Sequence, residues 1–261
     1  MISARHSVLL LDNAGDRSSF AAAKDAAVKL GLRKVGHTGT LDGNVTGLLL
    51  VAFEEATKGI PLLWGQDKEY AGVMRLESAV PHAQLRAAAA EFTGRITQVP
   101  PEKSRVRRVP RQRTVHLFEI NPPGNDRTAS FRCIVEAGTY VRTLLADLGE
   151  RLGVPIEMAA LRRTAIGPFR VEEAVTFERL TPRALLPLDD ALLRLGIPRA
   201  RITAEQEARI RKGLPLPHDG IEWIDAAASP AMLSLIGDRG VIVAVARRSH
   251  YGWHAFHVLA P

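Results

Sequence analysis

Cysteine is almost absent from this sequence of 261 residues, which contains only Cys133. A single cysteine excludes an internal disulfide framework and a zinc site built from cysteine ligands. No apolar run approaches the roughly 20 residues that a helix needs to cross a bilayer. Residues 1–15 lack the succession of basic segment, apolar segment and small-residue cleavage site that marks a signal peptide. These absences predict a cytoplasmic protein. Cys133 itself is expected to be a buried thiol on a strand.

Internal repeats and low-complexity tracts are also missing, and the remaining composition is typical of a soluble globular protein. Hydrophobic residues make up 46% of the chain and charged residues 24%. A chain of this length can bury a full core, and one large plus one small domain is its natural division. The character of the sequence changes near Pro187, so we predict a large domain over residues 1–186 and a small one over residues 187–261.

Positive charge is unevenly placed along the chain. The formal net charge is +7, yet residues 187–261 hold nine Lys and Arg against eight Asp and Glu. Much of the excess is one run uninterrupted by acidic residues, made of Lys103, Arg105, Arg107, Arg108, Arg111 and Arg113. Such a run is often a solvated face or a flexible arm. Because arginine binds phosphate through a planar, two-pronged group, we favour nucleic acid as the partner of this run.

Hydrophobic periodicity predicts alternating strands and helices. Strands are expected at residues 7–11, 48–53, 70–76, 115–120, 129–136, 241–246 and 255–259. Helices are expected at residues 20–30, 81–92, 141–152 and 188–195, and a further helix begins after Thr203, which has Gln206 at the capping-box spacing. The segment 58–67 reads as a connection and the segment 98–113 as a Pro-rich basic loop.

The most unusual stretch is the glycine-rich segment 36–47, which brackets Asp42 and precedes an apolar run of strand length at residues 48–53. A phosphate-binding loop is excluded, because no Gly-Lys-Ser/Thr ends the segment and no helix pattern follows it. Two interpretations remain from the local residues. Asp42 stands either in an ordinary turn that bonds its own backbone, or on a rigid mount in which Thr38, Thr40 and Asn44 hydrogen-bond it.

Three long motifs resemble those of the TruB/dyskerin family of RNA pseudouridine synthases. They are GHTGTLD at residues 36–42 with TG at 46–47 and EATK at 55–58, EAGTYVR at 136–142 with DLG at 147–149, and LRRT at 161–164 with GPF at 167–169. The resemblance covers most of residues 8–180. The segment QVPP at 98–101 and the arginines after it are similar to the archaeal and eukaryotic dyskerin branch.

The resemblance implies a role for each matching residue. Asp42 is the catalytic nucleophile, Arg142 pairs with it, and Tyr70, within DKEY at 67–70, stacks on the target base. The residues that would contact RNA are His37, Tyr140 and Leu161, of which Leu161 helps to line the pocket, together with the basic run. One departure is plain: the family's N-terminal Leu-Asp-Lys-Pro is LDNA at residues 11–14 here, so the lysine and the proline are missing.

The family fold is α+β, with a mixed, largely antiparallel central sheet, flanking helices and a small C-terminal domain of the PUA-like RNA-binding type. The implied function is isomerisation of uridine to pseudouridine in RNA, with the T-loop uridine at position 55 of tRNA as the expected substrate. Nothing is oxidised and no group is imported, so neither a metal nor an organic cofactor is required. Two alternatives stay open: the catalytic subunit of a guide-RNA-dependent particle with accessory proteins, and a non-catalytic RNA-binding scaffold.

Overall fold

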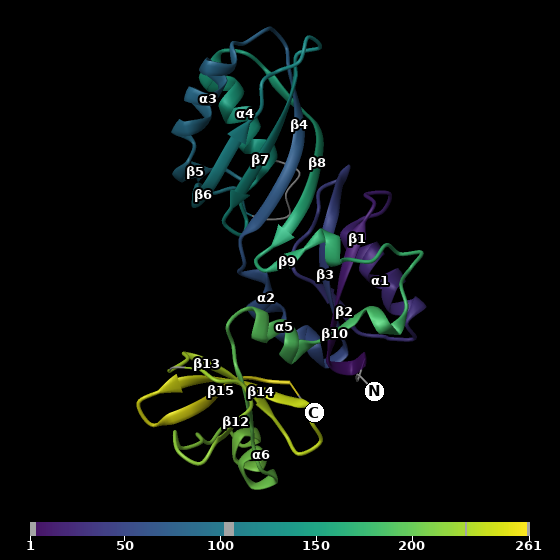
Figure 1. The fold of residues 1–261 in the computed structure, drawn as a ribbon, viewed down its shortest axis with the longest axis vertical. Coiled ribbons are helices and arrows are strands. Elements are labelled where there is room, and N and C mark those ends of the chain that lie inside the picture. The colour runs from purple at the N-terminus through teal and green to yellow at the C-terminus, as the bar shows by residue number, and fades with distance from the viewer. Residues whose placement is uncertain (1–3, 102–106, 228, 260–261) are drawn as a thin grey trace.

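The computed structural model describes residues 4–101, 107–227 and 229–259, which form two β-sheets with flanking helices (Figure 1). The larger, ten-stranded sheet has the order β10-β1-β3-β8-β4-β7-β6-β5, with β2 paired to β3 and β9 paired to β8. Its strands are β1 (Ser7–Asn13), β2 (Val35–His37), β3 (Val45–Phe53), β4 (Lys68–Leu76), β5 (Gly94–Gln98), β6 (Arg111–Ile120), β7 (Thr128–Val135), β8 (Ile156–Ile166), β9 (Phe169–Arg170) and β10 (Leu185–Pro187). Among these strands only β3 and β8 pair in parallel. The predicted mixed, largely antiparallel sheet is confirmed.

The helices begin and end where local signals place them. They are α1 (Ser19–Lys29), α2 (Ile60–Trp64), α3 (His82–Glu91), α4 (Val141–Leu152), α5 (Leu188–Arg194) and α6 (Ala204–Arg211). The hydroxyl of Ser18 accepts a hydrogen bond from the backbone of the first turn of α1, and Thr203 with Gln206 forms the predicted capping box of α6. In Figure 1, α3 and α4 lie together over one face of the strands β4 to β8, while α1 lies beside β2 and β3.

The second sheet is built from the C-terminal part of the chain and has the order β12-β11-β13-β14-β15. Its strands are β11 (Arg199–Arg201), β12 (Glu222–Trp223), β13 (Met232–Ile236), β14 (Ile242–Ser249) and β15 (Gly252–Val258). It does not stand apart from the larger sheet. One buried cluster joins Leu50 of β3 and Leu188 of α5 to Val245 of β14 and to Leu259. The helix α5 therefore connects the two sheets through a shared hydrophobic core.

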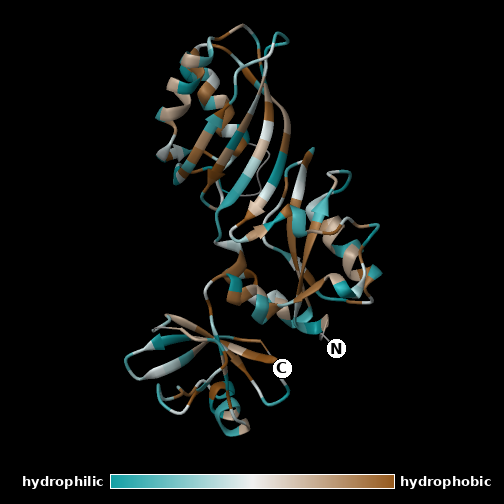
Figure 2. Ribbon diagram, viewed as in Figure 1, coloured by the Kyte–Doolittle hydropathy of each residue, from teal (hydrophilic) through white to brown (hydrophobic). Residues whose placement is uncertain are grey.

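The strand β3 runs through the middle of the core. Its residues from Gly47 to Phe53 are all buried, as the apolar composition of both its faces predicted. Apolar residues follow the strands of both sheets in Figure 2. Cys133 lies on β7 with no exposed surface, and burial raises the pKa of its thiol to about 12. The prediction of a buried strand thiol is thus confirmed.

Several segments differ from the sequence-based expectation, among them short strands such as β2 and β5 that were not predicted. Residues 58–67 are not only a connection, because a 3₁₀ turn (Glu54–Gly59) and α2 occupy most of them. The segment 98–113 is not one loop: Gln98 ends β5 and residues 111–113 begin β6. The long strand β8 was not predicted at all, because Arg162 and Arg163 interrupt its apolar pattern. It forms because β3 and β4 pair with it from either side, so tertiary pairing overrides the local pattern.

No helix in the described ranges is long and apolar enough to cross a membrane.

Candidate active site

The two halves of the larger sheet meet where β3 and β8 run parallel. The paired residues are Val45 with Leu161, Thr46 with Arg162, and Gly47 with Arg163. Gly47 has a φ of 105°, and a Cβ on it would lie 2.3 Å from the carbonyl oxygen of Arg163. Only glycine lets the two backbones approach this closely in that conformation. The last glycine of the segment 36–47 is therefore required by the joint between the sheet halves.

Asp42 lies in the loop that leads into this joint, and it faces the start of α4. Its Oδ2 is 3.2 Å from Nη2 of Arg142, the second residue of that helix. The two side chains are 45% and 44% exposed. Two residues that are a hundred positions apart in the sequence thus form an ion pair that a ligand can reach. The guanidinium holds the carboxylate in one orientation at a place where a substrate could meet it, as a carboxylate nucleophile requires.

The backbone of the loop is fixed at several points. The Leu41 amide donates to the hydroxyl oxygen of Ser19 at 2.7 Å, and the Val45 amide donates to the carbonyl of Asp42 at 3.0 Å. The expectation that Thr38, Thr40 and Asn44 hydrogen-bond the Asp42 carboxylate is wrong: among the described residues, that carboxylate is paired with Arg142 alone. The Thr38 hydroxyl is buried and has no hydrogen-bond partner in the described ranges, whereas Thr40 and Asn44 are exposed. The Asp42 loop is therefore fixed by hydrogen bonds of its backbone groups.

Two buried polar side chains, whose roles the sequence did not reveal, support the two sides of the ion pair. Arg163 is 1% exposed and donates from Nε to the carbonyl of Leu48 at 2.7 Å and from Nη2 to that of Gly39 at 3.1 Å. Gln98 is 3% exposed, accepts from the Tyr140 amide at 3.0 Å and donates to the Tyr140 carbonyl at 3.2 Å. Tyr140 is the N-cap residue of α4. Gln98 therefore fixes the start of the helix that carries Arg142.

The other sequence-predicted residues lie around the same joint. Tyr70 on β4 is opposite Arg163 on β8, is half-buried, and packs against the cluster that contains Leu161. His37 is on β2, where its Nδ1 accepts from the Gly39 amide at 3.3 Å. Burial and the nearby Arg163 lower the pKa of His37, so its imidazole is neutral at neutral pH. Tyr70, Leu161 and His37 are all held on strands that border the Asp42 loop.

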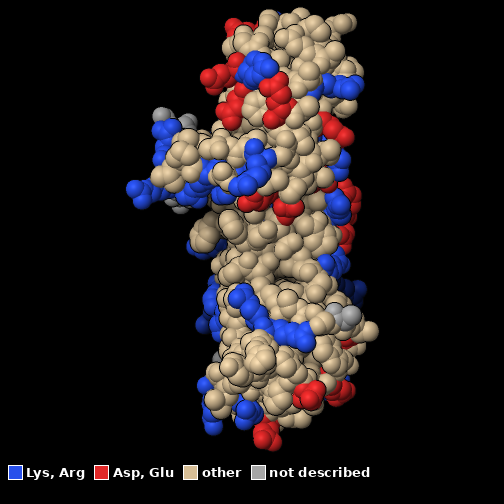
Figure 3. Space-filling view, turned by 90° about the vertical axis from the view of Figure 1, so that its left-hand side faces the viewer, with Lys and Arg blue, Asp and Glu red and all other residues tan. Residues whose placement is uncertain are grey.

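Part of the basic run is exposed to solvent, and part of it contacts the site. Arg107 and Arg108 are exposed, and Arg111 is the first residue of β6. Arg113 lies 3.7 Å from the carboxylate of Glu136 and against Gly138, so it contacts the motif that leads into α4. Lys103 and Arg105 lie outside the described residues. Lys and Arg side chains gather on a projection from the upper half of the molecule and over its lower part in Figure 3.

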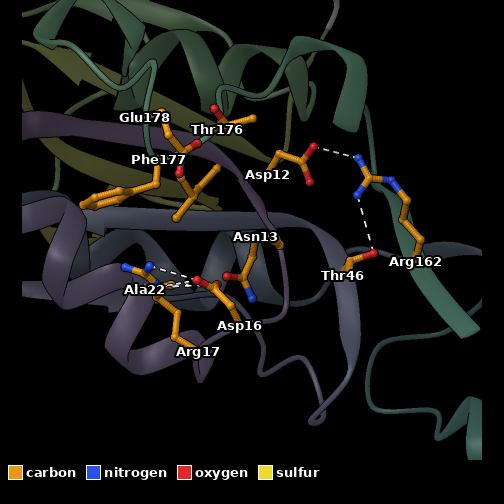
Figure 4. Close-up of a pocket in the computed structure, with 12 residues that line it drawn as sticks. Asp12, Asn13, Asp16, Arg17, Ala22, Thr46, Arg162, Thr176, Phe177 and Glu178 are labelled. Carbon is orange, nitrogen blue, oxygen red and sulfur yellow. Dashed lines mark hydrogen bonds and ion pairs between the residues drawn. The ribbon is translucent and has the colours of Figure 1, made fainter.

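A cavity of about 330 Å³ is lined by residues of β1, β3, β8 and the start of α1, and neither Asp42 nor Arg142 lines it (Figure 4). Consecutive residues of a strand point to opposite faces, so Arg162 points into this cavity while Arg163 points beneath the Asp42 loop. Arg162 forms an ion pair with Asp12 at 2.7 Å. Asn13 and Ala14, which replace the lysine and proline of the family motif, line this cavity. The departure from the family pattern thus falls away from the ion pair of Asp42 and Arg142.

Across the described part of the chain, no three His, Cys, Asp or Glu side chains are grouped so that they could hold a metal ion.

Comparison with known proteins matches most of the chain to one family. Residues 28–141 match the TruB family pseudouridylate synthase (N terminal domain), and residues 142–193 match the tRNA pseudouridylate synthase B C-terminal domain. A probable tRNA pseudouridine synthase B of Methanothermobacter thermautotrophicus is 39% identical over 75% of this chain and 64% of its own length. One from Methanosarcina acetivorans is 34% identical over 92% of this chain and 75% of its own length. The chain thus spans somewhat under two thirds of the first of these relatives.

Solved structures with the same fold cover nearly the whole chain. A Cbf5-Nop10-Gar1 complex contains a chain that superposes with a TM-score of 0.81 at 29% identity, over 99% of this chain and 86% of that one. An H/ACA RNP bound to a substrate RNA containing 2'-deoxyuridine gives a TM-score of 0.79 at 28% identity, over 98% of this chain and 86% of that one.

Proposed function

The chain belongs to the TruB family of pseudouridylate synthases, and on that premise we propose that it isomerises uridine to pseudouridine in RNA. The observation that carries this proposal is the reachable ion pair of Asp42 and Arg142 at the joint of the sheet. A scaffold protein has no need of a carboxylate and a guanidinium fixed in this way, beside a half-buried tyrosine. The non-catalytic alternative is therefore disfavoured.

The proposed chemistry uses groups that the chain itself supplies. The bond from ribose C1′ to base N1 breaks, the base turns, and C1′ bonds to C5; C5 loses a proton and N1 gains one. Asp42 is the anionic nucleophile, and Arg142 orients it through their ion pair. The target nucleotide must leave its stack, which costs a few kcal/mol, and Tyr70 offers an aromatic face that compensates part of that cost.

For the substrate, we propose the T-loop uridine at position 55 of tRNA. The names of the relatives support it, since each is a probable tRNA pseudouridine synthase B. The structural likeness to Cbf5 in its complexes with Nop10 and Gar1 supports the alternative, a guide-RNA-dependent particle with accessory proteins. We also propose a catalytic domain at residues 1–186 and a small PUA-like domain at 187–261, in line with the separate sheet of β11 to β15.

The deciding experiment is incubation of the purified protein with unmodified tRNA, in the absence of guide RNA and other proteins, followed by mapping of pseudouridine. We expect modification at the T-loop uridine. Product that forms only after addition of a guide RNA and accessory proteins would favour the particle. RNA binding without product under either condition would favour the scaffold.

Replacing Arg107 and Arg108 with alanine should weaken RNA binding regardless of RNA sequence. Both side chains belong to the basic run and are exposed. Each lost phosphate contact should reduce the slope of log affinity against log salt concentration by at most about one unit. The matched control is Arg75→Ala with Arg86→Ala, which removes the same charge from two exposed positions elsewhere. Affinity and salt slope are measured by salt titration. Equal effects of the two double variants would mean that the basic run is only a solvated face, without a specific role in RNA binding.

A further inference from the structure

Arg163 is a charged side chain in an unusual setting. Its 1% exposure places it among the largest fully buried side chains of the protein. Arginine is rarely buried without a paired charge, because removing the charge from water is costly. Yet no carboxylate among the described residues forms an ion pair with Arg163. Its hydrogen-bond acceptors are two backbone carbonyls. The place of these carbonyls in the chain therefore shows which segment Arg163 holds.

The two carbonyls lie on either side of Asp42. Gly39 precedes Asp42 by three positions and Leu48 follows it by six, so the guanidinium bridges the two ends of the loop. The planar fork of an arginine presents its donors at fixed angles and can hold two acceptors at once. A single buried side chain therefore fixes the separation of the two ends of the segment that carries the proposed nucleophile.

The surroundings of Arg163 are shaped to admit it. Gly47 lets β3 approach the Arg163 backbone, because a Cβ there would lie 2.3 Å from the Arg163 carbonyl oxygen, whereas a Cβ on Gly39 would be in ordinary contact with Nη1 of Arg163, at 3.7 Å. Lys68 is also buried nearby and donates to the carbonyls of Trp64 and Gln66 at 2.5 and 2.6 Å. Burial, and after it the charge of Arg163, lowers the pKa of Lys68 to about 8. Burial, and after it the same charge, lowers the pKa of His37.

We propose that Arg163 is a positioning residue, which holds the loop 39–48 in the conformation that presents the Asp42 carboxylate to Arg142 and to the target nucleotide. This inference rests on the proposed function of the site. Arg163 is buried beneath the loop, so it acts through Asp42 and does not touch RNA. The neighbouring Arg162 is paired with Asp12 and lies 3.5 Å from the hydroxyl of Thr46, but it bonds neither the Gly39 carbonyl nor the Leu48 carbonyl.

The test compares Arg163→Met, which keeps the length of the side chain and removes its donors, with Arg162→Met as the matched control. We expect Arg163→Met to lower the single-turnover rate of pseudouridine formation at least tenfold, with the RNA Kd changed less than threefold. Arg163→Lys, which keeps the charge and loses the fork, should recover only part of the rate. Arg162→Met should stay within threefold of the wild-type rate.

Hydrogen exchange supplies a readout that does not depend on activity. The amides of Thr38, Leu41 and Val45 are hydrogen-bonded in the loop and should exchange at least tenfold faster in Arg163→Met, while those of β14 keep their wild-type rates. If wild-type protein makes no pseudouridine, the proposed function fails, and exchange alone decides the positioning role. Unchanged loop exchange overturns the inference, whatever the rate. If Arg163→Met does not fold, the same two measurements on Arg163→Lys decide.

Discussion

Asp42→Asn is expected to abolish pseudouridine formation and to leave RNA binding nearly intact. The amide has almost the size of the carboxylate, and the loop is held through backbone groups and through Ser19 and Arg163, so the fold should persist. An amide carries no negative charge and cannot serve as the nucleophile. We expect RNA affinity to change by less than about tenfold, which corresponds to about 1.4 kcal/mol.

The measurement pairs single-turnover rate with RNA affinity for the wild type and Asp42→Asn, and circular dichroism checks the fold. Asp238→Asn makes the same chemical change at an exposed residue between β13 and β14, so it controls for the loss of one negative charge. Substantial turnover by a well-folded Asp42→Asn protein would remove Asp42 from the mechanism. It would also remove the main support for the proposed function.

The parts of the fold that the sequence predicted are those with a local pattern. The apolar run at residues 48–53 predicted the buried strand β3, and the leucine spacing at residues 141–152 predicted α4 with its observed bounds. The strand β8 was missed for a physical reason. A charged residue inside an apolar pattern normally indicates solvent, whereas Arg163 is buried because two backbone carbonyls accept its hydrogen bonds.

The residues of the candidate site likewise fall into those whose role the sequence implied and those whose role it did not. Asp42 and Arg142 stand in long motifs, so resemblance pointed to both, and the structure places them 3.2 Å apart. The supporting residues Arg163 and Gln98 also stand in matching segments, LRRT and QVPP, but the resemblance implied no role for either. Gln98 looks like a polar residue before two prolines, and only the return of the chain at Tyr140 shows what it binds. Positions whose function lies in contacts between distant segments are invisible to periodicity and to local propensity.

Because the ion pair of Asp42 and Arg142 is exposed, its contribution to folding stability differs from its contribution to catalysis. With about 45% of each side chain exposed, the Coulomb energy between Asp42 and Arg142 is screened by water, and such pairs contribute at most about 1 kcal/mol to folding. Bound RNA would exclude that water. The Coulomb attraction between a carboxylate and a guanidinium is stronger where water is excluded. Arg142 should therefore matter most when the substrate is in place.

Arg142→Ala is accordingly expected to lower the single-turnover rate about 100-fold, or about 2.7 kcal/mol in the barrier, and to change the free energy of unfolding by less than about 1 kcal/mol. The matched control is Arg151→Ala, on the same helix as Arg142, which breaks an ion pair of similar exposure with Glu91 of α3. That control should match Arg142→Ala in stability and the wild type in rate. A wild-type rate for Arg142→Ala, or a rate that falls equally in both variants, would contradict the assigned role of Arg142.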